Sequence, residues 1–269
     1  MTTALDKIVA YKKNEVAALR HARMVTDMMS EVSRQAPPRG FVNALSELAE
    51  TGENALICEM KRKSPSAGEI LPGANPMAIA REYEAGGAAC LSVLTDWPSF
   101  GGSAADFAAI REVVSIPMLR KDFMIDTLQV LEARAMGADA ILVILSCTDD
   151  ALASDLIQAA SDLGMDSVIE THDEAEIERA LALPKPEKGA SLIGINNRDL
   201  KIMKTDLGTS ERLAPMVPDS EAFVSESGIS EVDDIVRLRA CGAKRFLIGE
   251  SLMKRDDRRE HVARLRAAI

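Results

Sequence analysis

Residues 55–61 of the chain, Ala-Leu-Ile-Cys-Glu-Met-Lys, form a short apolar run that ends in charged side chains. Runs of this kind recur along the chain, and a polar cluster and a segment with helical spacing follow each one. We therefore predict eight strands, at residues 55–61, 89–95, 117–121, 140–145, 167–170, 192–196, 222–225 and 245–249. Eight strands alternating with helices are the number found in a (β/α)8 barrel, so the sequence predicts an α/β TIM barrel.

The segments between these runs are amphipathic and often end at glycine. Examples are residues 78–85 before Gly86 and Gly87, 130–136 before Gly137, and 235–240 before Gly242. Glycine suits the left-handed conformation that closes a helix. Because no serine- and glycine-rich linker interrupts the series, we expect a single domain over residues 1–269. An open doubly wound sheet is the alternative, although it normally has fewer strands and a glycine-rich first turn.

The first fifty residues differ from the rest and predict a helical extension before the barrel. Apolar residues recur there at roughly helical spacing, at Ile8, Val9, Val16 and Leu19. Residues 35–40 contain two prolines and a glycine, which predict a break. After the break, Phe41, Leu45 and Leu48 indicate a short second helix.

Composition excludes several classes of protein. Of the 269 residues, 47% are hydrophobic, which is too many for a disordered chain. The 32 Lys and Arg against 42 Asp and Glu give a formal charge of −10. This charge argues against a general nucleic-acid binder, which needs basic surface to neutralise phosphates. A small anionic substrate remains compatible with it, because a local basic cluster can lie in an acidic protein.

The sequence also indicates a compartment. The segment from Met1 to Lys13 is mixed in charge and does not resemble a signal peptide. No uncharged apolar run is long enough to span a bilayer, so we expect no membrane partner. The cysteines are widely separated, at Cys58, Cys90, Cys147 and Cys241. Free buried thiols in reducing cytosol are the expectation, and with it a cytoplasmic location.

We expect no metal and no nucleotide cofactor. The histidines, His21, His172 and His261, stand alone and lack the spacing of metal ligands, so each is interpreted as a solvated or helix-surface side chain. The glycine-rich patterns that bind dinucleotides or nucleoside triphosphates are also missing from the sequence.

Polar side chains gather at the carboxyl ends of the predicted strands, where barrel enzymes carry their chemistry. These residues are Glu59, Lys61, Lys121, Glu170, Asn196, Arg198, Glu226 and Ser227. Side chains of one strand alternate between its two faces, so Glu59 and Lys61 point the same way. Lysines and glutamates that share one barrel mouth would neutralise one another and shift each other's pKa values.

Simpler interpretations exist for each residue alone. Glu59 could form a structural ion pair with Lys61 or Lys63, and Glu170 could cap the helix that follows it near His172. Asn196 and Arg198 could be turn residues. The recurrence of charge at the ends of most strands favours a common site over these separate explanations.

Two further features suggest what the site binds. Lys61, Ser64, Gly228, Gly249 and Glu250-Ser251 match the barrel pattern in which backbone N–H groups after strands seven and eight hold a phosphate. Trp97, Phe100 and Phe123 follow strands two and three in a chain with only 3% aromatic residues, which suggests an apolar patch for a ring. Alternatively, Trp97 and Phe100 only anchor their loop.

Several of these segments together resemble the indole-3-glycerol-phosphate synthase family. The matching stretches are 57–66 (ICEMKRKSPS), 91–95 with 100–103 (FGGS), 119–123 (LRKDF), 195–200 (INNRDL), 224–229 (VSESGI) and 247–253 (LIGESLM). The resemblance covers nearly the whole chain, including the N-terminal helices. Ala67 departs from the pattern, because family members often have Lys before the glycine; this removes one basic group from the first loop but touches no proposed catalytic position.

The resemblance implies a carboxy-lyase of tryptophan biosynthesis that works without metal or cofactor, as a monomer. Its substrate would be 1-(2-carboxyphenylamino)-1-deoxyribulose 5-phosphate, which undergoes ring closure, decarboxylation and dehydration. Lys121 would be the general acid, Glu59 and Glu170 would move protons and stabilise positive charge, and Lys61 would assist dehydration or bind phosphate. The remaining implied roles are substrate positioning by Asn196, Arg198, Glu226 and Ser227, phosphate binding by Ser64, Gly228, Gly249 and Glu250, and ring contact by Pro65, Phe100 and Phe123.

Two other functions are compatible with parts of this pattern. Another phosphosugar lyase or aldolase on the same fold would use Lys121 as a Schiff-base nucleophile. A non-catalytic phosphate-binding or scaffold protein would need no matched acids and bases. The combination of Glu59, Lys121 and Glu170 argues against this second alternative.

Overall fold

The computed structural model describes residues 3–200, 202–218 and 222–269. Eight parallel strands of this described part close into a barrel in sequence order, because β1 pairs with both β4 and β10. The barrel strands are β1 (Ala55–Met60), β4 (Cys90–Leu94), β5 (Met118–Lys121), β6 (Ala140–Ile144), β7 (Asp166–Thr171), β8 (Ser191–Asn196), β9 (Phe223–Glu226) and β10 (Arg245–Ile248). The predicted TIM barrel is confirmed, and the doubly wound alternative is wrong.

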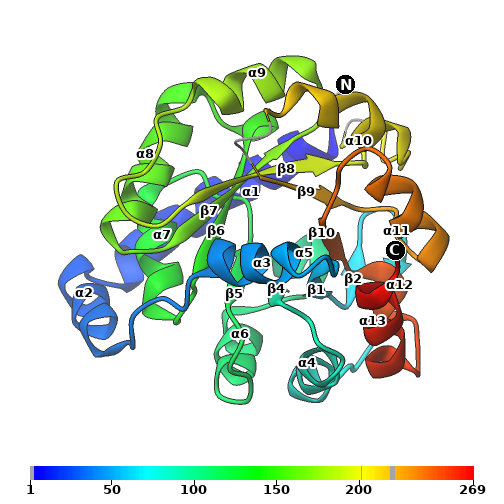
Figure 1. The fold of residues 1–269 in the computed structure, drawn as a ribbon. Coiled ribbons are helices and arrows are strands. Elements are labelled where there is room, and N and C mark those ends of the chain that lie inside the picture. Colours follow the sequence, from blue (N-terminus) through cyan, green and yellow to red (C-terminus); the bar gives the residue numbers. More distant parts are fainter. Residues whose placement is uncertain (1–2, 201, 219–221) are drawn as a thin grey trace.

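Helices surround the strands, as Figure 1 shows. The outer helices are α4 (Pro76–Ala85), α6 (Ala104–Arg111), α7 (Thr127–Ala135), α8 (Asp150–Asp162), α9 (Glu174–Ala182), α10 (Gly208–Leu213), α11 (Val232–Arg239) and α13 (Arg258–Ala267). Shorter elements lie in the loops: β2 (Lys63–Ser64), β3 (Gly68–Glu69), α5 (Trp97–Phe100), η1 (Leu145–Cys147), η2 (Ala214–Met216) and α12 (Glu250–Met253). The sequence did not predict these short elements. Among them, the β2–β3 hairpin contains two of the predicted site residues, Ser64 and Pro65.

Glycine ends the outer helices as predicted. Gly87 after α4, Gly137 after α7 and Gly242 after α11 have φ of 91°, 87° and 92°. A residue with a Cβ would be strained in that left-handed conformation, so glycine allows the chain to turn from each helix into the next strand.

Strand side chains alternate between two apolar clusters. On β1, Ala55 and Ile57 belong to the cluster inside the barrel, whereas Leu56 and Cys58 pack outward against the helices. This alternation is the two-residue period of a strand. Glu59 is the next residue of β1 after Ile57 whose side chain points into the barrel. Its carboxylate therefore lies at the carboxyl end of the barrel.

The N-terminal extension consists of three helices rather than the two that were predicted: α1 (Ala4–Ala22), α2 (Val25–Arg34) and α3 (Phe41–Glu50). The extra break lies at Arg23, whose backbone is extended. α3 contributes Phe41, Leu45 and Ala49 to the interior cluster next to Ala55, at the amino end of the strands. In Figure 1, α3 crosses the front of the barrel and α1 runs behind the strands.

α1 is held at the opposite, carboxyl end of the barrel by a buried ion-pair cluster. The Nζ atom of Lys12 lies 2.9 Å from Oδ1 of Asp96 and 2.7 Å from Oδ1 of Asp122. The Lys12 side chain is only 1% exposed. Asp96 follows β4 and Asp122 follows β5, so a single lysine joins α1 to the ends of two neighbouring strands.

Two other predictions concern the chain as a whole. In the part of the chain that the structure describes, no helix combines the length and the apolar character needed to cross a membrane. All four cysteines are free thiols; Cys58 and Cys90 are buried, whereas Cys147 and Cys241 are half-buried.

Candidate active site

A cavity of about 350 Å³ opens at the carboxyl end of the barrel. The strand alternation explains which side chains reach it: Leu119 on β5 and Val168 on β7 point into the barrel, and so do Lys121 and Glu170 two positions later. The predicted residues that line the cavity are Glu59, Lys61, Phe100, Lys121, Phe123, Glu170, Asn196, Arg198, Glu226, Ser227, Gly228, Gly249 and Glu250. Residues from most strands therefore share one space, as the sequence predicted.

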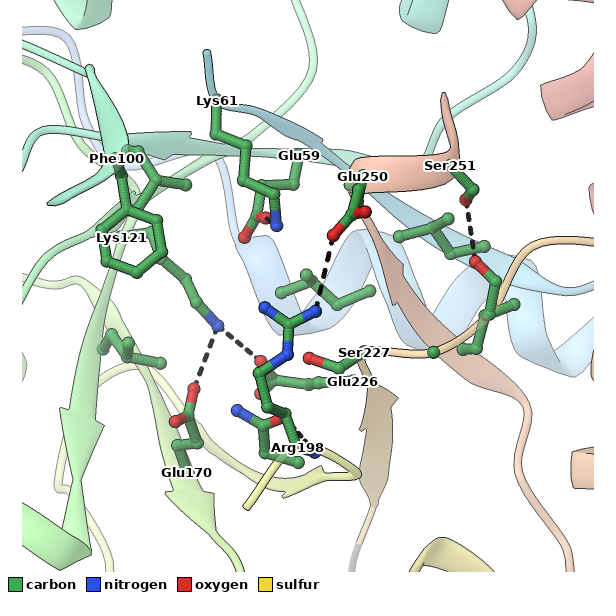
Figure 2. Close-up of a pocket in the computed structure, with 18 of the residues that line it drawn as sticks. Glu59, Lys61, Phe100, Lys121, Glu170, Arg198, Glu226, Ser227, Glu250 and Ser251 are labelled. Atoms are coloured by element: carbon green, nitrogen blue, oxygen red, sulfur yellow. Dashed lines mark hydrogen bonds and ion pairs between the residues drawn. The ribbon is translucent and has the colours of Figure 1, made fainter. Parts of the chain in front are cut away.

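Lys121 lies at the centre of the charged groups, between two carboxylates (Figure 2). Its Nζ donates a hydrogen bond of 2.5 Å to Oε2 of Glu226 and one of 3.1 Å to Oε2 of Glu170. Burial opposes the charged form of Lys121, but the two carboxylates outweigh it and raise the pKa of the ammonium above its usual range. Lys121 is therefore positively charged at neutral pH.

The two carboxylates next to Lys121 differ in their affinity for protons. Burial raises the pKa of Glu226 to about 7, because the nearby charge of Glu170 adds to it and Lys121 offsets it only in part. Burial acts on Glu170 in the same direction, but Lys121 and His172 outweigh it and lower the pKa of that carboxyl. The site thus contains one carboxylate that stays ionised and one that titrates near neutrality, which is the arrangement that acid–base chemistry requires.

Glu59 and Lys61 form a second pair. The Nζ atom of Lys61 lies 2.5 Å from Oε1 of Glu59. Burial opposes ionisation of Glu59, yet Lys61 and Lys121 lower the pKa of its carboxyl. The ion pair between Glu59 and Lys61 therefore exists, and it lies inside the cavity with Lys61 9% exposed and Glu59 3% exposed.

Two glycines leave the space that two of these carboxylates occupy. A Cβ atom at Gly194 on β8 would lie 2.4 Å from Oε1 of Glu226. A Cβ atom at Gly249 after β10 would lie 2.5 Å from Oε1 of Glu59. Real Cβ atoms do not approach oxygen so closely, so the conformation of each glutamate depends on the absence of a side chain at the neighbouring glycine.

The loops after β9 and β10, the seventh and eighth barrel strands, meet at one side of the cavity. Ser227 and Gly228 have φ of 67° and 82°, and the hydroxyl of Ser251 donates 2.8 Å to the carbonyl of Ile229 (Figure 2). A serine in the left-handed region is strained, and such residues cluster at functional sites. Barrel enzymes bind phosphate with the backbone of these two loops.

Arg198 reaches the same side. Its Nη2 atom lies 3.5 Å from Oε2 of Glu250, and its Nε donates 3.2 Å to Oγ1 of Thr205. The backbone N–H of Arg198 also donates 3.0 Å to Oδ1 of Asn196. Both residues therefore do what the turn interpretation required, and both also line the cavity.

Two of the three aromatic residues line the cavity, and their part in ring binding remains a prediction. The rings of Phe100 and Phe123 lie 6.2 Å apart at an angle of 34°, and both line the cavity. Trp97 instead is 63% exposed and is not among the lining residues. It begins the short helix α5, and its exposed side chain argues against ring binding in the cavity.

Ser64 and Pro65 do not line the cavity. They lie in the β2–β3 hairpin after β1, where Oγ of Ser64 accepts 3.1 Å from the N–H of Ala67. Their roles in phosphate binding and ring contact remain predictions, which would require this hairpin to lie closer to the substrate.

The prediction for the histidines was wrong in two cases. The His172 side chain is only 11% exposed, and it lies between Glu170 and Glu176. His261 is 1% exposed, and its Nε2 lies 2.8 Å from the carbonyl oxygen of Ser230. Glu170 does not cap α9, because the carboxylate of Asp173 accepts from the N–H of Glu176 there. The position of His172, two residues after the inward-pointing Glu170, could have indicated this contact. Its separation from other histidines in the sequence favoured the solvated interpretation instead.

The described residues contain no group of three or more His, Cys, Asp or Glu side chains arranged to hold a metal ion. The charged groups of the cavity are instead paired with one another, carboxylate against ammonium or guanidinium. This arrangement can supply protons, accept them and stabilise both signs of developing charge.

The comparisons with known protein sequences agree with one another. Residues 5–265 match the family model described as indole-3-glycerol phosphate synthase. The chain is 60% identical over 269 residues to the indole-3-glycerol phosphate synthase of Hyphomonas neptunium, which covers 100% of both chains. It is 48% identical over 258 residues to that of Rhodospirillum rubrum, which covers 96% of each.

Solved structures with less similar sequences share the fold. A crystal structure of 3-hexulose-6-phosphate synthase superposes with a TM-score of 0.60 at 17% identity, covering 80% of this chain and 99% of that one. A thiamine phosphate pyrophosphorylase from Pyrococcus furiosus gives 0.55 at 15% identity, with 79% and 93% covered. At such low identity these two likenesses concern the barrel alone.

Proposed function

Because the chain belongs to the indole-3-glycerol phosphate synthase family, we propose that its barrel cavity binds 1-(2-carboxyphenylamino)-1-deoxyribulose 5-phosphate and converts it to indole-3-glycerol phosphate. The enzyme is a carboxy-lyase of tryptophan biosynthesis. One observation carries the assignment of roles: Lys121 lies in hydrogen-bond contact with both Glu170 and Glu226 in the cavity.

Ring closure is the step that calls for a proton donor. As the aromatic carbon attacks the ketone carbon of the substrate, the ketone oxygen gains electron density. The ammonium of Lys121 donates a proton to that oxygen and becomes an amine, and the ketone oxygen becomes a hydroxyl. The high pKa of Lys121 ensures that it carries this proton before the substrate binds. Substrate binding has to separate Lys121 from Glu226, which makes the ammonium a stronger acid.

Decarboxylation follows from the positive charge that ring closure creates. The iminium nitrogen of the closed ring accepts the electrons of the breaking C–C bond, so the substrate supplies its own electron sink. Glu170 and Glu59 are ionised carboxylates at the cavity wall and stabilise this charge. Dehydration then needs a proton on the leaving hydroxyl and a base for the ring proton. Lys61 can give the first, as can Lys121 once it has taken up a proton again from solvent, and Glu170 can accept the second.

Binding of the substrate uses both sides of the cavity. Phe100 and Phe123 offer the apolar surface for the carboxyphenyl ring. The loops with Ser227, Gly228 and Gly249 offer backbone N–H groups for the phosphate, and Lys61 adds positive charge. Asn196, Arg198 and Glu226 offer polar contacts to the sugar chain between these ends. Ser64, Pro65 and Glu250 complete the proposed contacts.

Several wider properties belong to the same proposal. We infer that residues 1–269 form one domain in which residues 1–50 are the helical extension. The enzyme acts in the cytoplasm as a monomer, without metal or organic cofactor and without nucleic-acid or membrane partners. Supporting observations are the net charge of −10, the free thiols and the pairing of the cavity's charges among themselves.

The aldolase alternative requires an unprotonated amine at Lys121. The raised pKa of Lys121 disfavours that form, so the general-acid role fits the site better. The test is to incubate enzyme with the named substrate, follow the fluorescence of the indole product, and add borohydride to a parallel sample. Product formation without a covalent adduct is expected. An adduct on Lys121 would overturn the general-acid role, and an enzyme without turnover would overturn the substrate assignment.

A further inference from the structure

His172 contacts Glu170, and it is not among the residues that line the substrate cavity. It follows β7, the strand that ends with Glu170 and Thr171. Its Nε2 atom is 3.3 Å from Oε1 of Glu170, and its Nδ1 atom is 3.0 Å from Oε2 of Glu176. One imidazole ring therefore joins a proposed catalytic carboxylate to a second carboxylate on α9.

Both ring nitrogens of His172 face carboxylates, which accept hydrogen bonds and do not donate them when ionised. A neutral imidazole has one N–H and could serve only one of the two. The contact of Nδ1 with Glu176 has hydrogen-bond geometry, whereas Nε2 meets Glu170 as an ion pair without it. Two carboxylates within 3.3 Å of one ring favour the imidazolium cation.

The second carboxylate is fixed by the start of its helix. Oε2 of Glu176 also accepts 2.8 Å from the backbone N–H of His172, and the N–H of Glu176 donates 3.0 Å to Oδ1 of the capping residue Asp173. Glu176 is only 9% exposed. The start of α9 thus holds Glu176, Glu176 holds the ring of His172, and the ring reaches Glu170.

We propose that His172 is a positioning residue whose fixed positive charge keeps Glu170 ionised and oriented while Lys121 transfers its proton to the substrate. This inference rests on the proposed function. In the resting site Glu170 has two cationic neighbours, Lys121 and His172. When the N–H bond of Lys121 breaks and the ketone oxygen takes the proton, Lys121 becomes neutral. His172 then remains as the counter-charge of a buried carboxylate that must stay negative to stabilise the iminium.

The other groups around this pair act in consistent directions. Lys121 and a hydrogen bond from Asn196 lower the pKa of Glu170, as His172 does. The charges of Glu170 and Glu59 raise the pKa of Glu226. Burial of the Cys147 thiol, together with the charges of Glu170 and Glu176, raises its pKa to about 12, so this thiol is neutral in the working range. Burial opposes the charge on His172, but Glu170 and Glu176 outweigh it and raise the pKa of the ring to about 10.

The test compares His172→Gln with Asp173→Ala. The first variant removes the cation but keeps a polar side chain of similar size. The second removes the cap of α9 and loosens the same helix start without removing the charge. For His172→Gln we expect the acid limb of the kcat/KM profile to move up by about one pH unit, because Glu170 becomes easier to protonate. Asp173→Ala should leave the position of that limb unchanged.

A second measurement does not depend on turnover. The ring nitrogens of His172, assigned by the signal that disappears in His172→Gln, should show the imidazolium form at pH 8 in ¹⁵N NMR of the intact enzyme. A neutral ring at pH 8 would overturn the proposal, and so would an acid limb that stays in place in His172→Gln. If the wild-type enzyme fails to turn over the named substrate, the proposed function fails instead, and the NMR result still decides the charge of His172.

Discussion

The ammonium nitrogen of Lys12 lies 2.7 Å from Oδ1 of Asp122, the residue that follows Lys121 in the chain. Asp122 also accepts 2.8 Å through the same oxygen from the N–H of Phe123, and Asp96, the other partner of Lys12, caps the helix that ends at Phe100. Lys12 thus connects α1 to both of the loops that carry the cavity's phenylalanines.

Replacing Lys12 by Met should therefore weaken both the fold and substrate binding. Two buried carboxylates lose their shared cation, which typically costs about 3–5 kcal/mol when one partner of a buried pair is removed. We expect a lower free energy of unfolding in urea and a raised KM. Arg111→Met is the matched control, because Arg111 pairs with Asp139 at the amino end of the barrel with similar burial. Equal KM values in the two variants would show that Lys12 has no role at the cavity.

Gly194→Ala should damage catalysis through Glu226. The added Cβ would lie 2.4 Å from Oε1 of that carboxylate, so the glutamate must move and its contact with Lys121 must change. Displacement of a reacting group by about 1 Å can cost roughly 10²-fold in rate, and a decrease of that order in kcat/KM is expected. Gly208→Ala, which faces the exposed Asp206, serves as control. Activity within a factor of about two of wild type in Gly194→Ala would show that a side chain at position 194 does not displace the Glu226 carboxylate.

The stability of the enzyme should depend on the protonation of Glu226. Its pKa is raised from 4.5 to about 7 in the folded protein, so the folded state holds a proton that the unfolded chain releases. This contribution is fully present below pH 4.5 and is lost as the pH rises to about 7. The difference in unfolding free energy between Glu226→Gln and wild type should therefore grow across this window, by at most roughly 3 kcal/mol.

Urea titrations of both proteins at several pH values between 4 and 8 measure this difference. Because Gln cannot ionise, other titrating groups cancel to first order in the comparison. A difference that is constant across the window would show that the pKa of Glu226 is not raised.

Treatment with a chelator should leave the rate unchanged. The iminium of the substrate accepts the electrons of decarboxylation, and ammonium groups meet the negative charge on the ketone oxygen, so no step calls for a metal ion. The measurement is the initial rate of product fluorescence before and after dialysis against chelator. A loss of rate that added divalent cation restores would contradict this mechanism.

The position of the proposed catalytic groups could be predicted because it depends on a one-dimensional pattern. Glu59, Lys121 and Glu170 each follow an apolar run at its carboxyl end, and a closed parallel barrel brings all such ends together. The eight strands were located for the same reason, with ends that differ by at most one residue from the observed ones.

Features that depend on contacts between distant residues could not be predicted in this way. The break at Arg23 between α1 and α2 has no glycine or proline to mark it. The contacts of His172 with Glu170 and Glu176 depend on how α9 packs against β7, and the clearance of Glu226 depends on Gly194 in the neighbouring strand. Ser64 and Pro65 matched a motif, but the β2–β3 hairpin keeps them away from the cavity lining.

The role of Lys121 is the central claim, and the turnover of Lys121→Met tests it most directly. This variant keeps the length of the side chain but removes the ammonium group that donates hydrogen bonds to Glu226 and Glu170. With circular dichroism matching wild type, kcat for indole-3-glycerol phosphate formation should fall by roughly 10²–10⁴-fold, as expected for loss of a general acid. A decrease of less than about tenfold in the folded variant would contradict the assignment of Lys121 as the proton donor.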